Sequence, residues 1–215
     1  MAELSKTGKL QIIEDKLQNC FRCEISKSRN NLVFGTGNPD TRIMFIGEAP
    51  GRDEDLQGKP FVGRAGQLLT KIIESIGLKR EEVYIANILK CRPPNNRDPE
   101  PDEINNCEQF LKQQIEIIQP EIICSLGRIS AQALLKTQAP ISRLRGQFFI
   151  YENIKLIPTF HPAYLLRNPH DKIKVWDDMK KIKEILDNPR PNRTTPETNK
   201  EQKPEKEFSK QLNLF

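Results

Sequence analysis

The sequence predicts an α/β protein in which helices cover both faces of a parallel sheet. Short apolar runs, typical of strands buried on both faces, alternate with segments that have helical spacing. This alternation is the pattern of an open, doubly wound sheet, which binds its ligands beyond the carboxyl ends of the strands. Functional residues are therefore expected just after the strands.

The first half of the chain is expected to supply three helices and two strands. RIMFIG (42–47) and VYIANIL (83–89) are the continuous apolar runs of buried strands. Gly66 and Gly77 bound the second helix, and Pro120 ends the third. The residues at helical spacing are Leu10, Ile13 and Leu17 in the first helix, Leu68, Leu69, Ile72, Ile73 and Ile76 in the second, and Ile104, Cys107, Phe110, Leu111, Gln114, Ile115 and Ile118 in the third.

The second half of the chain continues the alternation. EIICSLG (121–127) is a third buried strand, and a helix is expected at 128–136. FFIY (148–151) and IKLIPTF (154–160) are two more strands joined by a short polar turn. HPAYLLRNP (161–169) interrupts the pattern. A last helix carries Ile173, Trp176, Met179, Ile182 and Ile185.

The composition is that of a folded protein, since 36% of the 215 residues are hydrophobic and 29% are charged. We expect one domain at residues 1–187. Residues 188–215 form a polar, proline-bearing tail, expected to be disordered because it cannot offset its ordering entropy. With no signal peptide and no run of roughly 20 apolar residues, we expect a cytoplasmic protein without a membrane partner. A net charge of +5 suits a polyanion but also fits proteins that never touch one.

Four of the five cysteines have a spacing that suits a metal site. Cys20 and Cys23 form a C-x2-C pair, Cys91 follows a strand, and Cys107 lies on a helix 16 positions later. Four thiolates from two regions can close a tetrahedral zinc site or hold a cubane iron-sulfur cluster, and the spacing leaves both open. Ordinary buried cysteines are the third interpretation. Cys124, inside a buried strand, is interpreted as a core residue.

The loop after the first strand is expected to bind a flat ligand. GEAPG (47–51) does not match the dinucleotide fingerprint G-x-G-x-x-G. The phosphate-binding loop is also absent from this segment, because it needs Ser or Thr after Gly-Lys and here Gly58 and Lys59 are followed by Pro60. Small residues at a strand end allow the backbone to approach a ligand closely, and Phe61 can stack on it. The alternative is that Phe61 only anchors the loop to the core.

Two polar residues stand out at strand ends. Asn87 places an amide in a buried strand, where it must bind either local backbone or the edge of a ligand. His161 directly follows a strand, whereas the other histidine, His170, lies in a polar stretch. An enzyme that needs an imidazole is therefore expected to use His161.

Several motifs together resemble one enzyme family. GEAPG (47–51), GKPFVGRAG (58–66), NILKCRPP (87–94), HPAYLL (161–166) and the four-cysteine spacing are similar to the type-4, iron-sulfur-containing uracil-DNA glycosylases over about residues 20–186. The resemblance implies a three-layer α/β/α fold with a central, mainly parallel four-stranded sheet. It also implies a monomer that works on DNA in the nucleoid, where it excises uracil and so begins base-excision repair. The implied cofactor is a [4Fe-4S] cluster on Cys20, Cys23, Cys91 and Cys107.

The resemblance also implies roles for single residues. Uracil must be flipped out of the duplex to be reached. Asn87 then corresponds to the residue that pairs with uracil O4 and N3–H, Phe61 to the stacking aromatic, and His161 to the donor to uracil O2. Gly47, Glu48 and Ala49 line the pocket.

The group that activates the attacking water is less clearly marked. Ala49 stands where the type-1 enzymes of the superfamily have an aspartate. Glu48 is the preferred candidate, and Asp53, Glu54 and Asp55 are the other nearby carboxylates.

DNA contacts are expected mainly from the HPAYLLR segment. Leu165 or Leu166 would fill the space left by the flipped nucleotide, and Arg167 would lie near phosphate. Further phosphate candidates are Arg92, Arg97, Arg143 and Arg145. The basic, histidine-containing insert of the covalent uracil-trapping branch is missing, so turnover is expected. The alternatives to an enzyme of this family are a non-catalytic iron-sulfur DNA-binding or polymerase-associated module and, more remotely, a zinc hydrolase.

The chain ends in QLNLF. Gln211, Leu212, Leu214 and Phe215 resemble the short peptide by which bacterial repair proteins bind the DNA sliding clamp. An incidental apolar terminus is the alternative.

Overall fold

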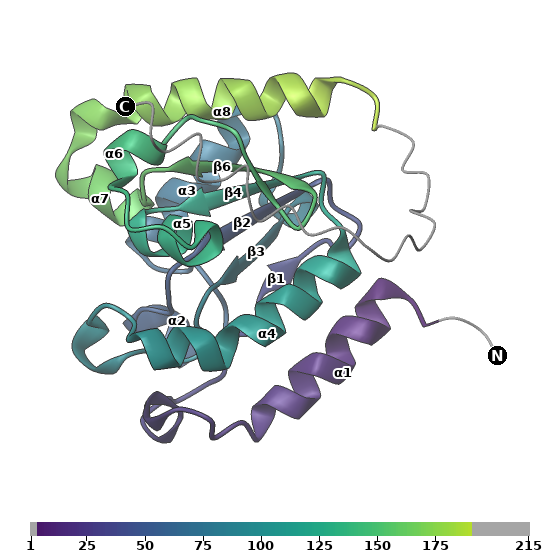
Figure 1. The fold of residues 1–215 in the computed structure, drawn as a ribbon, viewed down its shortest axis with the longest axis vertical. Helices are drawn as coiled ribbons and strands as arrows, with labels where there is room; N and C mark the ends of the chain where they lie inside the picture. The colour runs from purple at the N-terminus through teal and green to yellow at the C-terminus, as the bar shows by residue number, and fades with distance from the viewer. Residues whose placement is uncertain (1–3, 191–215) are drawn as a thin grey trace, which may run out of the picture.

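The computed structural model describes residues 4–190 and is built on a central six-stranded sheet with the order β1-β3-β2-β4-β6-β5 (Figure 1). The four middle strands are parallel, and β1 and β5 pair antiparallel at the edges. The predicted parallel four-stranded core is therefore confirmed. The edge strand β5 corresponds to the predicted FFIY strand, whereas the edge strand β1 was not predicted. The strands are β1 (Thr36–Gly37), β2 (Ile43–Gly47), β3 (Tyr84–Asn87), β4 (Ile122–Leu126), β5 (Phe149–Tyr151) and β6 (Ile154–Thr159).

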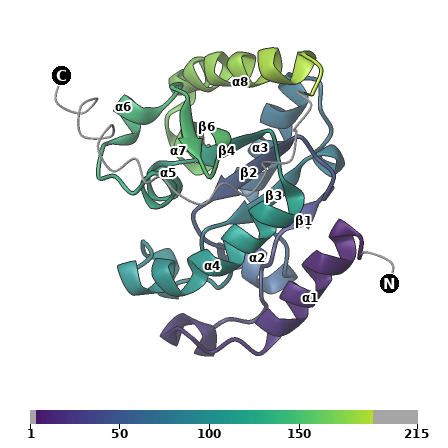
Figure 2. The ribbon, with the colours of Figure 1, turned by 45° about the vertical axis from the view of Figure 1, so that its right-hand side comes forward.

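Helices cover both faces of the sheet, as expected. Helices α1, α4 and α5 pack on one face, and α3, α7 and α8 on the other (Figures 1 and 2). The α-helices of the described chain are α1 (Lys6–Gln18), α2 (Arg52–Gln57), α3 (Arg64–Ser75), α4 (Pro101–Ile118), α5 (Arg128–Leu135), α6 (Ile141–Leu144), α7 (Pro162–Arg167) and α8 (Lys172–Asp187). Short 3-10 helices are η1 (Glu24–Lys27), η2 (Arg80–Glu82), η3 (Pro94–Asn96) and η4 (Pro169–Asp171).

The two faces of the sheet build two apolar cores. Along β2, Met44 and Ile46 face the α1, α4 and α5 layer, whereas Ile43 and Phe45 face the α3 and α8 layer. Successive strand residues point to opposite faces, and here both faces are covered. Each fully buried aliphatic side chain contributes about 1.5–3 kcal/mol relative to exposure. The parallel strands β2, β3, β4 and β6 are thereby fixed with their carboxyl ends at one rim.

Several elements were not predicted from the sequence, namely β1, α2, α6 and α7, and the buried face of α8 differs in part from the prediction. Residues 162–167 form the short helix α7, which is too short to show a periodicity in sequence. In α8, Met179 and Ile182 are buried as expected, but Ile173 is 62% exposed and Trp176 is 39% exposed. The buried face includes Asp178 instead, which forms an ion pair with Arg145. An apolar periodicity cannot reveal a face that contains a buried carboxylate.

Cys124 is fully buried in β4, as predicted for a core residue. None of the described helices is long and apolar enough to cross a membrane. Helix α8 ends at Asp187, and the expected tail from residue 191 onward, with QLNLF, lies outside the described residues.

Candidate functional site

The candidate site lies at the carboxyl ends of the parallel strands. Gly47, the last residue of β2, pairs in register with Asn87, the last residue of β3. A Cβ atom on Gly47 would lie 2.4 Å from Asn87 Oδ1 and 2.5 Å from Phe61 Cζ. The missing side chain is therefore what lets the Phe61 ring and the Asn87 amide meet at the end of β2.

The Asn87 side chain has a buried polar atom whose hydrogen-bonding capacity the described residues do not satisfy. The side chain is buried, and Oδ1 has no hydrogen-bond partner among the described residues. Leaving a buried acceptor unpaired costs about 1–3 kcal/mol, so such an atom indicates a ligand or a catalytic use. Of the two sequence interpretations, local backbone or ligand edge, this geometry favours the ligand.

Phe61 and His161 come together from distant segments. Their ring centroids are 5.6 Å apart, and the ring planes are inclined by 34°. Phe61 is buried and has a φ of 53°, in the left-handed region that bulky residues rarely adopt. Gly66 permits this conformation, because a Cβ atom there would lie 1.8 Å from the Phe61 carbonyl oxygen.

His161 is held as a neutral hydrogen-bond donor. It is the N-cap of α7, where its Nδ1 accepts from the backbone N–H of Ala163 at 3.1 Å. An acceptor Nδ1 puts the single proton of the neutral ring on Nε2. Burial, and secondarily the charge of Arg167, lowers the pKa of His161 to about 4, so the ring is uncharged near pH 7. Gly127 packs against it, since a Cβ atom there would lie 2.9 Å from His161 Cβ.

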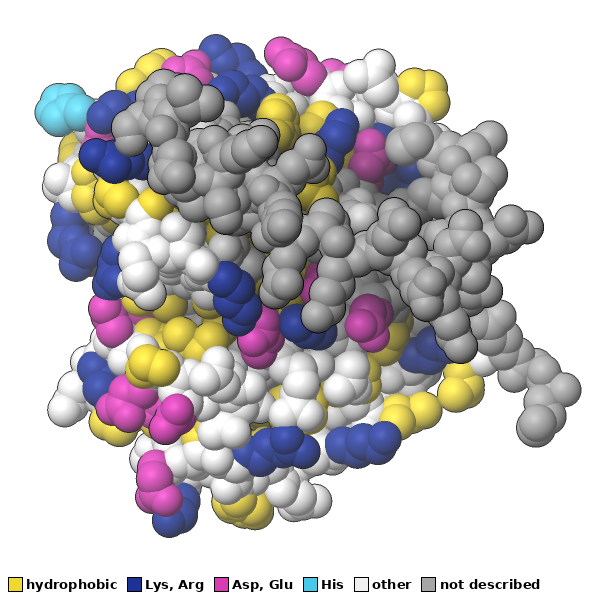
Figure 3. All heavy atoms as spheres, viewed as in Figure 1, with side chains coloured by type: hydrophobic (Ala, Val, Ile, Leu, Met, Phe, Trp, Pro, Cys, Tyr) yellow, Lys and Arg dark blue, Asp and Glu magenta, His cyan; other side chains and the backbone are white. Residues whose placement is uncertain are grey.

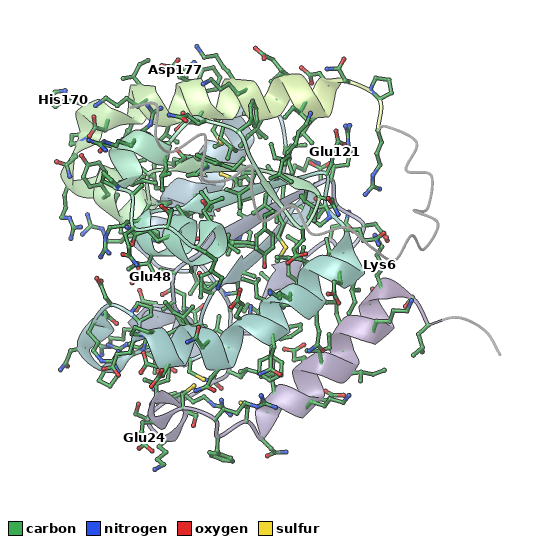
Figure 4. The ribbon with its side chains drawn as sticks, in the orientation of Figure 1. Lys6, Glu24, Glu48, Glu121, His170 and Asp177 are labelled. Atoms are coloured by element: carbon green, nitrogen blue, oxygen red, sulfur yellow. The ribbon has the colours of Figure 1, made fainter. Side chains whose placement is uncertain are left out.

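Glu48 is the carboxylate best suited to proton transfer. It follows Gly47 directly, and its carbonyl accepts from Leu89 N–H at 3.0 Å. Burial, reinforced by the charge of Asp98 and opposed by that of Arg128, raises the pKa of Glu48 to about 7. Figure 4 labels it at the end of the sheet opposite Glu121, which precedes β4. A carboxyl group with a pKa near 7 can exchange protons at neutral pH.

The neighbouring acids in this loop have structural partners. Glu54 accepts from the N–H groups of Val62 and Gly63. Asp55 is fully buried and accepts from Asn30, through its backbone N–H and its side-chain amide. These two carboxylates hold loops together, and Asp53 is exposed in the first turn of α2, so Glu48 is the part-buried acid of the group that directly follows the end of β2.

The segment expected to contact DNA is exposed only in part. Leu165 is 1% exposed and packs in the core, so its prediction as a wedge was wrong. Leu166 is 40% exposed on the same helix, and Arg167 is exposed beside it. The other histidine, His170, lies at the periphery of the molecule (Figure 4).

The arginines predicted to contact phosphate divide into two groups. Arg145 was wrongly predicted, because it pairs with the buried Asp178. Arg97 is also engaged, by a two-pronged bond to Glu103. Arg143 is exposed and Arg92 partly so. On the face seen in Figure 3, basic side chains are interspersed with acidic and apolar ones and form no single patch.

The four predicted cysteines line one cavity at the end of α1, separate from the strand-end site. No group of three or more His, Cys, Asp or Glu in residues 4–190 is arranged to hold a single metal ion. A single zinc would need thiolates drawn in to about 2.3 Å, whereas a cubane cluster puts its own iron and sulfide atoms between them. A wider set of four thiols fits the cluster better. The residues are Cys20, Cys23, Cys91 and Cys107.

The surroundings of the cysteines suit thiolates bound to such a group. Burial raises the pKa of Cys91 and raises that of Cys107 to about 11, so these thiols need a positive partner to ionise. Hydrogen-bond donors are directed at both of these sulfur atoms. Arg29 Nη1 lies 3.1 Å from Cys91 Sγ, and the backbone N–H of Lys90 is directed at Cys107.

Two residues with roles at these sites are not evident from the sequence. Lys90 is 1% exposed, and its Nζ donates to Asn87 O at 2.9 Å and to Gln114 Oε1 at 2.6 Å, linking the end of β3 to α4. Arg80 binds the carbonyl oxygens of Pro60 and Phe61. For Lys90 the sequence does contain a clue that could have been used, since this lysine directly follows the apolar run 83–89. Arg80 lies in the charged run KREE, which gives no such signal.

The fold and the two sites define a class: a three-layer α/β/α protein with a ligand site at the carboxyl ends of its parallel strands and a separate four-cysteine site. The model of the uracil DNA glycosylase superfamily matches residues 34–180, and the chain belongs to that superfamily.

Curated relatives place it more narrowly. It is 48% identical over 186 residues to the type-4 uracil-DNA glycosylase of Saccharolobus solfataricus, covering 82% of this chain and 86% of the relative. Identity to the type-4 enzyme of Archaeoglobus fulgidus is 45% over 190 residues, or 85% and 96% of the two chains. For that of Thermotoga maritima it is 44% over 181 residues, or 82% and 94%. The resemblance to the type-4 enzymes is confirmed.

Proposed function

We propose that this protein is a type-4 uracil-DNA glycosylase. It takes uracil out of DNA and hydrolyses the bond between the base and deoxyribose, which leaves an abasic site and starts base-excision repair. The observation that carries the proposal is the unpaired, buried Oδ1 of Asn87 beside the rings of Phe61 and His161. The high identity to type-4 enzymes supports it.

Uracil recognition follows from the Asn87 amide. Oδ1 accepts from uracil N3–H, and the amide nitrogen donates to O4, which satisfies the orphaned acceptor. Cytosine presents the opposite donor and acceptor at these positions, and each mismatched buried group costs about 1–3 kcal/mol. Phe61 stacks on the flipped base, as aromatic side chains do in base-flipping enzymes.

His161 stabilises the departing base. As the bond to C1′ breaks, its electron pair moves onto uracil and negative charge develops at O2. The Nε2–H of a neutral His161 donates a hydrogen bond there, and its geometry is preset by the bond from Ala163 to Nδ1. Loss of one such donor typically lowers the rate about 100- to 1,000-fold.

Glu48 serves as the general base. In its carboxylate form it accepts a proton from water as the water oxygen bonds to C1′, and uracil leaves with the electron pair of the broken bond. Its pKa of about 7 suits this exchange at neutral pH. On the DNA side, exposed Leu166 fills the gap left by the flipped nucleotide, and Arg167 binds phosphate.

The four cysteines hold a [4Fe-4S] cluster in this proposal. When bound, the cluster supplies iron–thiolate bonds that tie the segment after α1 to the loop after β3 and to α4. It takes no part in the hydrolysis itself. The cavity that they share and the donors directed at Cys91 and Cys107 support this assignment.

The activity is tested on labelled oligonucleotides that carry U:G, U:A, hypoxanthine or T:G pairs, or uracil in a single strand, followed by alkaline cleavage of abasic sites. We expect cleavage at uracil by the purified protein and loss of cleavage by Asn87→Ala. Binding without cleavage by the wild-type protein would favour a non-catalytic DNA-binding module.

We extend the proposal to the last five residues, which lie outside the described part of the chain. Gln211, Leu212, Leu214 and Phe215 are proposed to bind the bacterial DNA sliding clamp, because apolar residues at the end of a polar segment suit a pocket-docking peptide. Deleting residues 211–215 should abolish clamp pull-down while glycosylase activity on short DNA is unchanged. Retained clamp binding would contradict the extension.

A further inference from the structure

The main chain around Phe61 is held by hydrogen bonds from both sides. Phe61 has a φ of 53°, which a bulky residue keeps only when its surroundings enforce it. Three consecutive peptide units around the ring have side-chain partners elsewhere in the fold. The ring that meets His161 is therefore positioned by whatever holds this backbone.

Arg80 holds the carbonyl side. From η2, its Nη2 donates to Pro60 O at 2.8 Å and to Phe61 O at 2.9 Å, while Nη1 donates to Thr70 Oγ1 at 3.1 Å. The guanidinium group therefore joins the Phe61 segment to α3 as well as to η2. Its rigid, planar array of donors suits adjacent carbonyl oxygens in a way that a lysine ammonium does not.

Glu54 holds the amide side. Its Oε1 accepts from Val62 N–H at 2.9 Å and from Gly63 N–H at 3.0 Å. Burial lowers the pKa of Arg80, and the nearby charge of Glu54 opposes that shift, so the two side chains also attract each other. Together they form what we call the Phe61 clamp: Arg80 and Glu54.

Apolar packing does not replace the clamp on the outer side of the loop. A cleft of about 460 Å³ lies there, lined by Lys59, Pro60, Val62 and Arg80 together with residues around β1. A segment bordered by a cleft is not fixed by close-packed neighbours on that side. The Phe61 ring itself packs in the apolar core, so on the cleft side it is the hydrogen bonds from the clamp that hold the main chain.

We infer that Arg80 and Glu54 are positioning residues for base recognition: by fixing the left-handed main chain at Phe61, they set the ring against the site of Asn87 and His161 and so set the affinity for the flipped uracil. This inference rests on the proposed function. The clamp acts through the Phe61 ring and not on the rest of the DNA, which predicts a defect confined to DNA that carries the base.

The test compares Arg80→Met, Arg80→Lys, Glu54→Ala and Glu54→Gln with the wild-type holoenzyme. The apparent dissociation constant for a uracil-containing single strand is measured from single-turnover rates against enzyme concentration. Binding of the same strand with a tetrahydrofuran residue in place of the nucleotide is measured in parallel. Arg42→Met is the matched control, because Arg42 also donates to backbone carbonyls, those of Leu186 and Asn188 among them, but at the opposite rim of the sheet.

We expect Arg80→Met and Glu54→Ala to weaken uracil-strand binding about tenfold, the effect of losing a charge-assisted hydrogen bond of about 1.4 kcal/mol. Glu54→Gln keeps an acceptor and Arg80→Lys keeps the charge, so both are expected to retain part of the affinity. Tetrahydrofuran binding, and Arg42→Met throughout, should stay within about twofold of the wild type.

A double-mutant cycle decides whether the effect passes through the ring. In a Phe61→Ala background, Arg80→Met should cause no further loss of uracil-strand affinity. An equal loss in both backgrounds, or an equal loss on the tetrahydrofuran strand, would overturn the inference. If Arg80→Met fails to fold, the Arg80→Lys and Glu54→Gln cycles decide by the same criterion. A wild-type protein that releases no uracil instead refutes the proposed function itself.

Discussion

The rings of Phe61 and His161 lie with their centroids 5.6 Å apart and their planes inclined by 34°. One ring belongs to the loop between α2 and α3, the other to the turn between β6 and α7. Strands β2 and β6 flank β4 and run parallel to it, so their carboxyl ends open at the same rim. Sheet topology therefore joins two segments 100 positions apart into one site.

Replacing Gly47 by alanine should disable the site without unfolding the protein. The new methyl group would lie 2.4 Å from Asn87 Oδ1 and 2.5 Å from Phe61 Cζ, so both side chains must move away. We expect the single-turnover rate of uracil release to fall by at least about tenfold, the effect of one lost buried hydrogen bond. Rates on a uracil-containing oligonucleotide measure this.

Gly8→Ala is the matched control for this substitution. Gly8 lies in α1, where the nearest atom to an added Cβ is at an ordinary 3.6 Å. Gly8 lies in the first turn of α1, where alanine is at least as favourable as glycine, so this variant should be as stable as the wild type and fully active. Wild-type rates in Gly47→Ala would show that the contact of Asn87 and Phe61 at β2 is not needed for catalysis.

The sequence allowed the strand-end residues to be predicted because their chemistry conflicts with their surroundings. An amide in the apolar run of β3 and an imidazole after β6 are local conflicts that a single sequence displays. Whether Asn87 Oδ1 finds a partner within residues 4–190 depends on every neighbour that the fold brings near it, and no local sequence pattern contains this information.

The features that could not be predicted depend on tertiary contacts. Strand β1 has two residues and exists through its pairing with β3, so it has no periodicity of its own. Arg80 lies in a charged run that reads as solvent-exposed, yet it binds two carbonyls 19 and 20 positions away. Leu165 and Leu166 are indistinguishable by residue type, and only the seating of α7 buries the first and exposes the second.

His161 should act without changing its charge across the working pH range. Its pKa is lowered to about 4, well below the usual 6.5 of histidine, so its charge does not change between pH 5 and pH 8. The residual rate of Glu48→Gln, which lacks the Glu48 carboxyl group, should therefore show no limb near 6.5. His161→Ala should lower the rate about 100- to 1,000-fold. Single-turnover rates from pH 5 to pH 8 test both statements, and a histidine-dependent limb near 6.5 would mean that the imidazolium is the working form.

The same shift in the pKa of His161 affects stability. Between pH 6.5 and pH 4 the unfolded chain binds a proton at this residue and the folded chain does not, so the free energy of unfolding falls as the pH falls through that window. His161→Ala removes this contribution. Urea unfolding at pH 7 and pH 5 should therefore show a smaller loss of stability in the variant than in the wild type.

Glu48 should give the reaction its pH dependence. Its pKa is raised to about 7, and only the carboxylate form can take a proton from the attacking water, so the rate should rise as the pH rises through about 7. Glu48→Gln should lower the rate about 100- to 10,000-fold and remove this rise. Single-turnover rates from pH 5.5 to pH 9 at constant ionic strength measure both effects.

Asp53→Asn is the matched control for Glu48. Asp53 is an exposed carboxylate five positions further along the chain, in the first turn of α2. Its substitution should leave the rate and the pH profile unchanged. If Glu48→Gln retained the wild-type profile, another group would have to activate the water.

Substituting a cysteine of the shared cavity should cost the protein its fold as well as its iron. Cys91 lies in the loop after β3, where its Sγ accepts from Arg29 of the segment after α1, and a bound cluster would join these two segments by covalent bonds. We expect Cys91→Ala to lack iron and the brown absorbance of a cluster and to unfold at lower temperature.

Cys124→Ala is the matched control, because Cys124 is fully buried in β4 away from that cavity. It should lose some packing energy but keep its full iron content and its visible absorbance. A soluble, fully active Cys91→Ala protein without iron would show that the cluster is dispensable for the fold.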